Sequence, residues 1–224
     1  MRSDGVAAAL TFLRGGIISG ELTPGEKLNQ ADIARALGMS RIPVREALGI
    51  LASEGAVDYE RNRGYTVPKM TTAMLDEIYR MRALLEDDLL LGIRKPTAAE
   101  VTHLHEINDQ MSRAATGGDL SQFVPLNREF HFAVFELGQA PLMVQMIDRL
   151  WAMSESYRAI YLYDSRNAER SADEHRQLIE AIQAMDLPRC VQLSRSHRGV
   201  SQQHVREFLA ARKGYPRVSI APGT

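Results

Sequence analysis

The chain has 224 residues, of which 45% are hydrophobic and 25% are charged, with a formal net charge of −1. This composition is typical of globular proteins with apolar cores, and it excludes nucleic-acid binding through bulk positive charge. The single cysteine excludes a disulfide framework and a CxxC metal site, and no apolar run reaches the ~20 residues of a membrane span. We therefore expect a cytoplasmic protein of two modest domains, with no membrane partner.

The first 70 residues have the pattern of short helices followed by a small β element. Residues 9–20 are apolar at helical spacing, and residues 29–38 predict a second short helix that stops at Gly38. Ser40 is the expected N-cap of a third helix, in which apolar residues from Val44 onward recur at i, i+3, i+4 and i+7. Residues 56–70 favour two short strands around a turn at 61–64. This order predicts a winged helix-turn-helix.

Two arginines lie at the beginning of the third helix. Arg41 and Arg45 are one turn apart and roughly opposite the apolar stripe, and Pro43 fits the first turn, where its preset φ costs little. Free backbone N–H groups and two planar guanidinium groups suit a groove lined by phosphates and guanine edges. An isolated pair of this kind would instead indicate a solvated helix face paired with Glu46 or other carboxylates. The helix before it and the hairpin after it favour DNA binding.

From Thr72 onward the pattern is helical almost to the end and predicts an antiparallel all-α bundle of about six helices. The expected helices are 72–93, 98–115, 121–137, 141–163, 172–185 and 188–212. Capping boxes at Thr97–Glu100 and Ser171–Glu174 indicate two of the helix beginnings. The fold is thus expected to be mostly α, with a DNA-binding domain at 1–70, a helical effector- and metal-binding domain at 71–214 and a tail at 215–224.

Three of the six histidines lie on the apolar stripes of three different expected helices. These are His131, His175 and His197, and Asn127 lies one turn before His131 on the same face. Each could be a core histidine with a local hydrogen bond. Three that converge in one bundle match a divalent metal better, because buried imidazoles need partners. His103 and His105 fall off their stripe, while His204 shares the face of His197.

Arg82 also lies on an apolar stripe, among leucine and isoleucine side chains. One interpretation is an intrahelical ion pair with Glu86, four residues later. The other is a guanidinium group that faces a pocket and binds the carboxylate of an organic acid.

Residues 19–67 resemble the winged-helix domain of GntR-type bacterial transcription regulators, through the motifs PGEKL, IARALG, SRIPVREAL and RGYTV. The resemblance implies a homodimer that binds a short palindromic operator in double-stranded DNA. The DNA-binding residues that follow from it are Ser40, Arg41, Pro43, Arg45, Arg63 and Gly64.

The helical part resembles the FCD ligand-binding domain of the FadR-like GntR subfamily, through LNREFHFAVFELGQAPLM, SADEHRQLIEAIQAMD and the later His197. Many members hold a divalent metal of the zinc, nickel or manganese type through one aspartate and three histidines. The ligands implied here are Asn127, His131, His175 and His197. This chain departs from the pattern at Asn127, a neutral amide that is a weaker ligand than a carboxylate. An R-x-x-L-E helix lines the effector site in the resembled domain, which favours effector binding by Arg82.

Together these features predict a transcription regulator, most simply a repressor, whose operator binding is controlled by a small carboxylate metabolite. The alternative is a metal-dependent enzyme that uses the histidine cluster. That alternative leaves the arginine-bearing helix and the wing unexplained, and the sequence has neither a Gly-rich phosphate loop nor a nucleophile elbow.

Overall fold

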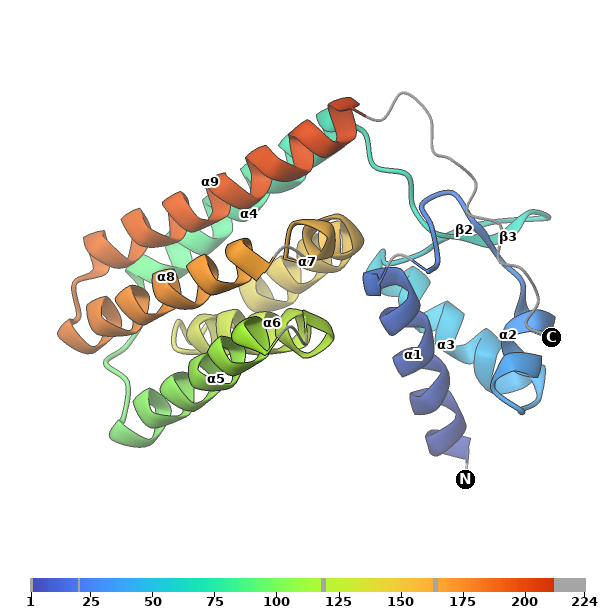
Figure 1. Ribbon diagram of the computed structural model, residues 1–224, viewed down its shortest axis with the longest axis horizontal. Coiled ribbons are helices and arrows are strands. Elements are labelled where there is room, and N and C mark those ends of the chain that lie inside the picture. Colours follow the sequence, from blue (N-terminus) through green and yellow to red (C-terminus); the bar gives the residue numbers. More distant parts are fainter. Residues whose placement is uncertain (1, 20, 118–119, 163–164, 212–224) are drawn as a thin grey trace.

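The computed structural model describes residues 2–19, 21–117, 120–162 and 165–211. Its N-terminal part contains α1 (Arg2–Ser19), β1 (Lys27–Leu28), α2 (Gln30–Ala36), α3 (Arg41–Glu54), β2 (Asp58–Glu60) and β3 (Gly64–Thr66). The remainder contains α4 (Thr72–Leu91), α5 (Ala98–Thr116), α6 (Leu120–Glu136), α7 (Pro141–Leu162), α8 (Ser165–Ala184) and α9 (Leu187–Ala211). The mostly helical fold class is confirmed (Figure 1). The expected helix end at Gly20 and the tail at 215–224 lie outside the described residues.

The N-terminal part is built around α3, whose buried face agrees with the predicted stripe. Its fully buried side chains are Val44, Ala47, Leu48 and Leu51. They pack with Leu13 of α1 and Leu28 of β1 in one apolar cluster. Burial of one leucine side chain contributes about 1.5–3 kcal/mol, so this cluster holds α3 firmly and leaves its polar face exposed.

The wing is an antiparallel hairpin of β2 and β3, to which β1 adds a third strand in the order β1-β3-β2. Tyr59 lies opposite Tyr65, and Glu60 lies opposite Gly64. Asn62 and Gly64 have φ values of 70° and 87°, which suit the tight turn because both residue types tolerate the left-handed region. The hairpin agrees with the prediction; β1 was not expected, because its segment has turn residues.

The bundle places α4 and α9 side by side, and α8 lies between α9 and α5, which in turn packs against α6 (Figure 1). Five of its six helices begin and end within two residues of their predicted bounds. The capping box of Thr97 and Glu100 is present at the beginning of α5. Pro125 lies inside α6.

The predicted beginning of α8 is wrong. The helix begins at Ser165, and Ser171 is fully buried within it. Residues 165–171 are polar apart from the fully buried Ala168, so they lack the apolar periodicity that reveals a helix. A Ser-x-x-Glu spacing also arises by chance inside helices, which is what misled the prediction here.

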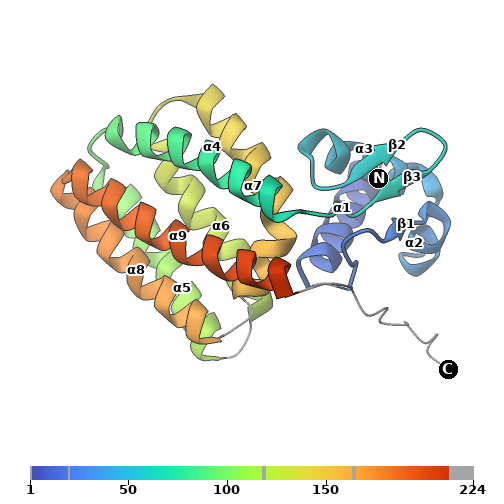
Figure 2. The same cartoon turned by 90° about the horizontal axis from the view of Figure 1, so that it is seen from above.

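The winged part rests on one helix of the bundle, α7 (Figure 2). Helices α1 and α3 both pack against α7, and Ala152 of α7 joins the apolar cluster of the winged part. Gly55 ends α3 with a φ of 80°, and a Cβ atom there would lie 3.0 Å from Cγ of Met153. The backbone of Met70, in the connection, donates to the hydroxyl of Tyr157 at 2.9 Å. Helix α7 therefore contacts both the winged part and the interior of the bundle.

No helix among the described residues combines the length and the hydropathy needed to span a membrane.

Candidate functional site

The first polar site is the exposed beginning of α3. Arg41 and Arg45 are both exposed, on the side away from the buried stripe. Ser40 occupies the N-cap position with extended backbone, but its hydroxyl makes no capping hydrogen bond. Pro43 is half-buried and faces α1. A Cβ atom added to Gly5 of α1 would lie 3.4 Å from the Cβ atom of Pro43. Within the described part of the chain neither arginine has an ion-pair partner, so the alternative of pairing with Glu46 is not observed.

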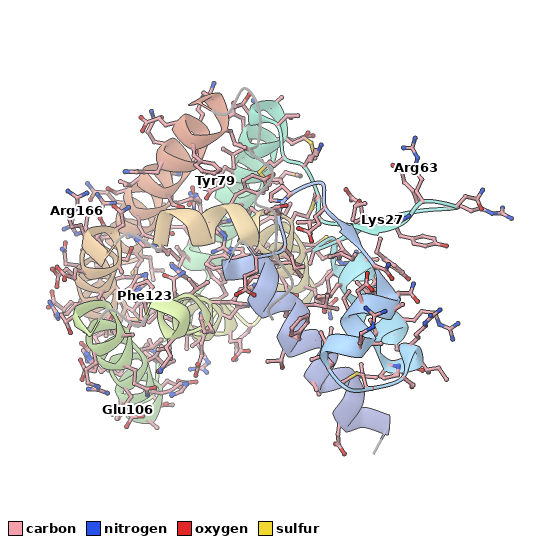
Figure 3. The ribbon with its side chains drawn as sticks, turned by 45° about the vertical axis from the view of Figure 1, so that its right-hand side comes forward. Lys27, Arg63, Tyr79, Glu106, Phe123 and Arg166 are labelled. Atoms are coloured by element: carbon pink, nitrogen blue, oxygen red, sulfur yellow. The ribbon has the colours of Figure 1, made fainter. Side chains whose placement is uncertain are left out.

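The wing adds further positive charge beside this helix. Arg61 and Arg63 are exposed at the turn between β2 and β3, and Arg63 pairs with Glu60 at 3.0 Å. Both members of that pair are exposed, so it contributes little to stability and leaves the guanidinium group accessible. Lys27, in β1, and Arg63, in the turn, lie in the part of the wing that extends away from the bundle (Figure 3). An exposed helix beginning flanked by a basic hairpin matches the geometry with which winged helices bind a duplex.

The second polar site lies inside the bundle, where the three predicted histidines meet. Nε2 of His131 lies 3.2 Å from Nε2 of His175 and 3.3 Å from Nε2 of His197. All three ligand atoms lie within 4.8 Å of one another. The helices that carry these side chains are α6, α8 and α9, so only the folded bundle brings them together.

The protonation of the cluster favours the metal-binding form of imidazole. Burial, and then the neighbouring His175 and His197, hold the pKa of His131 well below its usual 6.5. Burial, and then His197, hold the pKa of His175 well below the same value. Both rings are therefore neutral near pH 7, and a neutral imidazole can coordinate a metal.

Glu174 orients the third histidine of the cluster. Its Oε2 atom lies 2.6 Å from Nδ1 of His197. A carboxylate accepts hydrogen bonds, so Nδ1 carries an N–H and Nε2 is the atom that faces the other two rings. Glu174 was expected in the capping box at the predicted helix beginning, so this role was not predicted. Its position directly before His175 was the only signal available in the sequence.

The donor set fits a divalent cation. The Nε2 atoms of three histidines face one another, and Nε2 of His131 takes part in two of the close contacts. A ring nitrogen carries either one N–H or one lone pair, so it cannot form a linear hydrogen bond with both neighbours. Asn127 is 3% exposed, its Oδ1 atom has no hydrogen-bond partner, and it lines the same cavity as His131 and His197. Three imidazoles with an amide oxygen are an appropriate donor set for zinc or nickel.

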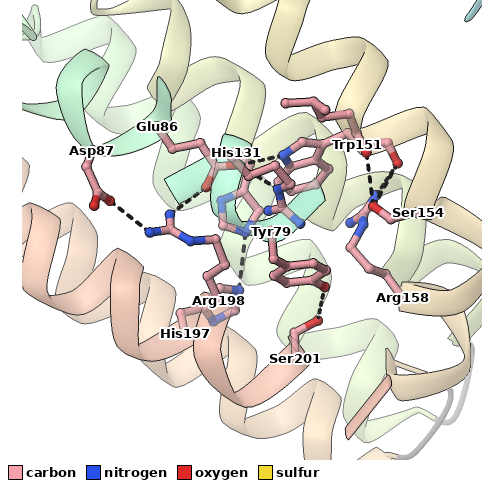
Figure 4. Close-up of polar contacts among 12 residues, drawn as sticks. Tyr79, Glu86, Asp87, His131, Trp151, Ser154, Arg158, His197, Arg198 and Ser201 are labelled. Atoms are coloured by element: carbon pink, nitrogen blue, oxygen red, sulfur yellow. Dashed lines mark hydrogen bonds and ion pairs between the residues drawn. The ribbon is translucent and has the colours of Figure 1, made fainter. Parts of the chain in front are cut away.

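A buried charge network lies beside the histidines and is centred on Glu86 of α4. This carboxylate, 2% exposed, accepts hydrogen bonds from Nε of Arg82 at 2.7 Å and from Nη1 of Arg198 at 2.7 Å. It also accepts one from the indole N–H of Trp151 at 2.9 Å. Asp87 accepts a further bond from Arg198 at 2.8 Å (Figure 4). Arg82 thus points inward, as predicted, and it also forms the ion pair with Glu86 that was the other interpretation, because both residues are buried.

Opposing effects determine the charge of Glu86. Burial alone would raise the pKa of this carboxyl group, but the charges of Arg82 and Arg198 and the hydrogen bonds from Arg82 and Trp151 outweigh it. The pKa therefore lies below its ordinary value, and Glu86 is ionised at neutral pH. Glu86 was predicted only as a partner of Arg82, because its contact with Arg198 joins residues 112 positions apart.

A small cavity lies between the histidines and the charge network. Its lining consists of Arg82, Asn127, His131, Trp151, Arg158, Leu162, His197, Arg198 and Ser201. About 20 Å³ of it is open to the centre of a water molecule, which is room for roughly one or two waters. A small organic ligand would therefore require some lining side chains to move apart. Arg158 was not among the predicted site residues.

A winged helix-turn-helix with exposed arginines at the beginning of its recognition helix defines a DNA-binding protein of the helix-turn-helix class. Residues 5–67 match the family described as "Bacterial regulatory proteins, gntR family", and residues 77–199 match the FCD domain family. The chain therefore belongs to the GntR family of bacterial transcription regulators and carries an FCD domain.

Relatives along most of the chain are similar regulators. The HTH-type transcriptional regulator McbR of Escherichia coli is 32% identical over 176 residues, covering 76% of this chain and 79% of McbR. The gluconate operon transcriptional repressor of Bacillus licheniformis is 30% identical, covering 82% of this chain and 77% of the repressor. The solved structure of E. coli McbR/YncC has a TM-score of 0.79 at 27% identity and covers 91% of this chain and 98% of that one. Since these relatives are regulators, the alternative of a metal-dependent enzyme is not supported.

Proposed function

We propose that this protein is a repressor that binds a palindromic operator as a homodimer and responds to a small organic acid bound in its helical domain. The exposed Arg41 and Arg45 at the beginning of α3 carry the DNA half of the proposal. The names of relatives, among them a repressor of a gluconate operon, support the sign of regulation. In this proposal residues 1–70 bind DNA in the cytoplasm and residues 71–214 bind the effector.

Replacement of Arg45 by alanine tests the DNA half. A bidentate contact of an arginine with a guanine is worth about 1–3 kcal/mol, and a symmetric dimer makes it in both half-sites. We therefore expect Arg45→Ala to weaken binding to the preferred palindrome roughly 30-fold or more. The measurement is a gel shift at about 100 mM salt, with an operator selected from a random pool by the wild-type protein.

The control is Arg113→Ala, which removes an exposed arginine from α5 of the bundle. It should bind the same operator with unchanged affinity. Two results would contradict the DNA half: wild-type protein that prefers no palindrome over random DNA, or Arg45→Ala that binds like the wild type.

The sensor half rests on the cavity and the residues around it. In the proposal Asn127, His131, His175 and His197 hold a divalent cation, which when bound offers a positively charged coordination site for a carboxylate. Arg82, with its buried and unpartnered Nη1 atom, contributes a hydrogen-bond donor to the same cavity. Trp151 lines the cavity while its neighbours Ala152 and Met153 contact the winged part. A ligand that moves α7 would thereby bias the position of the DNA-binding helix, provided that it binds the two positions with different affinity.

An exposed apolar face on α4 supports the homodimer. Met74, Met81, Leu84 and Leu91 are 38–69% exposed and fall on one side of the helix. Leu142 and Met146 of the adjacent α7 add exposed apolar surface. Contiguous exposed apolar side chains of this kind are typical of protein interfaces, and a two-fold axis would place the same face of a second copy against it.

We expect Leu84→Glu to convert the dimer to a monomer, because each interface would then bury two carboxylates near the symmetry axis. Sedimentation velocity measures the result. Thr102→Glu, which introduces the same charge at an exposed position of α5, should remain dimeric. If the Leu84→Glu protein sediments like the wild type, the exposed apolar face of α4 is not the dimer interface.

A further inference from the structure

Three buried arginines line the cavity, and within the described part of the chain two of them form ion pairs with carboxylates. Arg82, Arg158 and Arg198 are 4–6% exposed and come from α4, α7 and α9. Glu86 and Asp87 neutralise Arg82 and Arg198 through the ion pairs described above. Arg158 forms no ion pair with any carboxylate of the described residues. The cavity therefore carries more positive than negative charge before any metal is considered.

The guanidinium group of Arg158 has almost no polar contacts of its own. Its Nη2 atom donates a long hydrogen bond of 3.4 Å to the carbonyl of Trp151, and its Nε atom is buried without a partner. The group instead lies over the indole of Trp151, 4.0 Å from the ring centroid. Burial, and then the charge of Arg82, lower its pKa to about 10, although Glu155, which forms no ion pair with it, acts in the opposite direction. Arg158 therefore stays charged at neutral pH. A buried charge without an ion-pair partner destabilises the fold. The stability of the folded chain therefore does not account for a charged residue at this position, whereas a bound anion would.

We infer that Arg158 is the side chain that anchors an anionic group of the effector, while Arg82 is held in the fold by Glu86. A guanidinium group binds a carboxylate through two parallel hydrogen bonds, and Arg158 has its Nε donor free for this. The nearby Nη1 atom of Arg82 is also buried without a partner and supplies a further donor. The inference rests on the proposed function, because it identifies the residue that recognises the proposed organic acid.

The position of Arg158 determines how an acid would lie in the cavity. Arg158 and Ser154 lie on one side of Trp151, and His131 and His197 lie on the other (Figure 4). Arg158 and Asn127 line the same cavity. An acid with two or more carboxylates could therefore place one group on Arg158 and another beside the histidines. An uncharged analogue of the same shape would leave the guanidinium group unpaired and should bind poorly.

A purely structural role is the competing explanation. Arg158 covers one face of Trp151, and a cation–π contact contributes about 0.5–2 kcal/mol. Arg158→Met separates the two explanations, because methionine keeps an apolar stem against the indole but lacks the charge. If Arg158 acts as an anion anchor, the variant should unfold at the same or a higher temperature than the wild type. If the charge stabilises the core, it should unfold at a lower temperature.

The single tryptophan of the chain makes ligand binding directly observable. The indole of Trp151 contacts Arg82, Arg158 and His131, so its fluorescence emission should respond to an anion bound there. The purified dimer is titrated with acetate, succinate and citrate, and with succinamide as the uncharged match for succinate. We expect a saturable change with succinate or citrate and none with succinamide. Arg158→Met should raise the dissociation constant obtained from this titration roughly 10- to 100-fold.

Arg149→Met is the matched control, since Arg149 is an exposed arginine of the same helix. It should respond to acids like the wild type. An Arg158→Met protein that keeps wild-type acid affinity, or that unfolds at a clearly lower temperature, would overturn the inference. If the wild-type emission responds to none of the acids, the proposed effector class fails while operator binding can still succeed, and the unfolding comparison alone decides the role of Arg158.

Discussion

Replacement of Glu86 by glutamine should lower the free energy of unfolding by about 3–5 kcal/mol. Glu86 is 2% exposed and accepts hydrogen bonds from Arg82, Arg198 and Trp151. The neutral amide would leave Arg82 without a counter-ion and Arg198 with Asp87 alone, beside Arg158, which forms no ion pair with a described carboxylate. Urea unfolding followed by circular dichroism measures the loss of free energy. In a separate thermal unfolding experiment the midpoint temperature should fall by roughly 10 °C for a chain of this size.

The pH dependence of the same variant gives an independent check. Because the pKa of Glu86 is lowered in the folded state, its stabilising contribution is complete above the ordinary value of 4.5. That contribution is lost as the pH falls through the lower value of the folded state. The difference between wild type and Glu86→Gln should therefore be full at pH 7 and shrink in acid.

Glu106→Gln is the control for this prediction, because Glu106 is exposed on α5 and makes no ion pair with a described residue (Figure 3). Its effect should stay within about 0.5 kcal/mol. A Glu86→Gln protein as stable as the wild type at pH 7 would show that the buried arginines find compensation elsewhere.

Removal of one histidine from the cluster should abolish metal binding. We expect His131→Ala to lose the metal that elemental analysis detects in the wild type and to show no thermal stabilisation when zinc or nickel is added. For the wild type, metal at a hundred times its dissociation constant should raise the free energy of unfolding by about 2.7 kcal/mol. Differential scanning calorimetry with and without a chelator measures this gain.

A substitution of Asn127 tests the same metal site by an expected gain in affinity instead of a loss. Asn127→Asp replaces the unpartnered amide oxygen with a carboxylate, which should bind a divalent cation more tightly because it compensates charge. His103→Ala removes an exposed histidine and should leave the metal content unchanged. If the His131→Ala protein retains the wild-type metal content, the metal does not bind at the histidine cluster.

Much of the fold could be predicted because its signals are local. The stripe from Val44 to Leu51 indicated α3, and the Thr97–Glu100 capping box indicated the beginning of α5. Amphipathic periodicity depends only on residues a few positions apart, so it can be read without knowing the packing. Where that periodicity was weak, at residues 165–171, the prediction of α8 failed.

The candidate metal site was partly predictable for the same reason. An inward histidine is visible from its own helix, as for His131, His175 and His197. Which other side chains complete the site was not visible, because Glu174 contacts His197 across two helices. A local motif even pointed to the wrong role for Glu174.

The sequence by itself determined that the protein has a winged helix with two exposed arginines and a bundle with inward histidines, because each follows from spacing within one helix. Only the tertiary structure decided how the buried charges are distributed. Glu86 is joined to Trp151 and Arg198, which lie 65 and 112 positions away in the chain, while Arg158 forms no ion pair with any described carboxylate. Such contacts depend on how α4, α7 and α9 cross, and no periodicity within a single helix encodes that geometry.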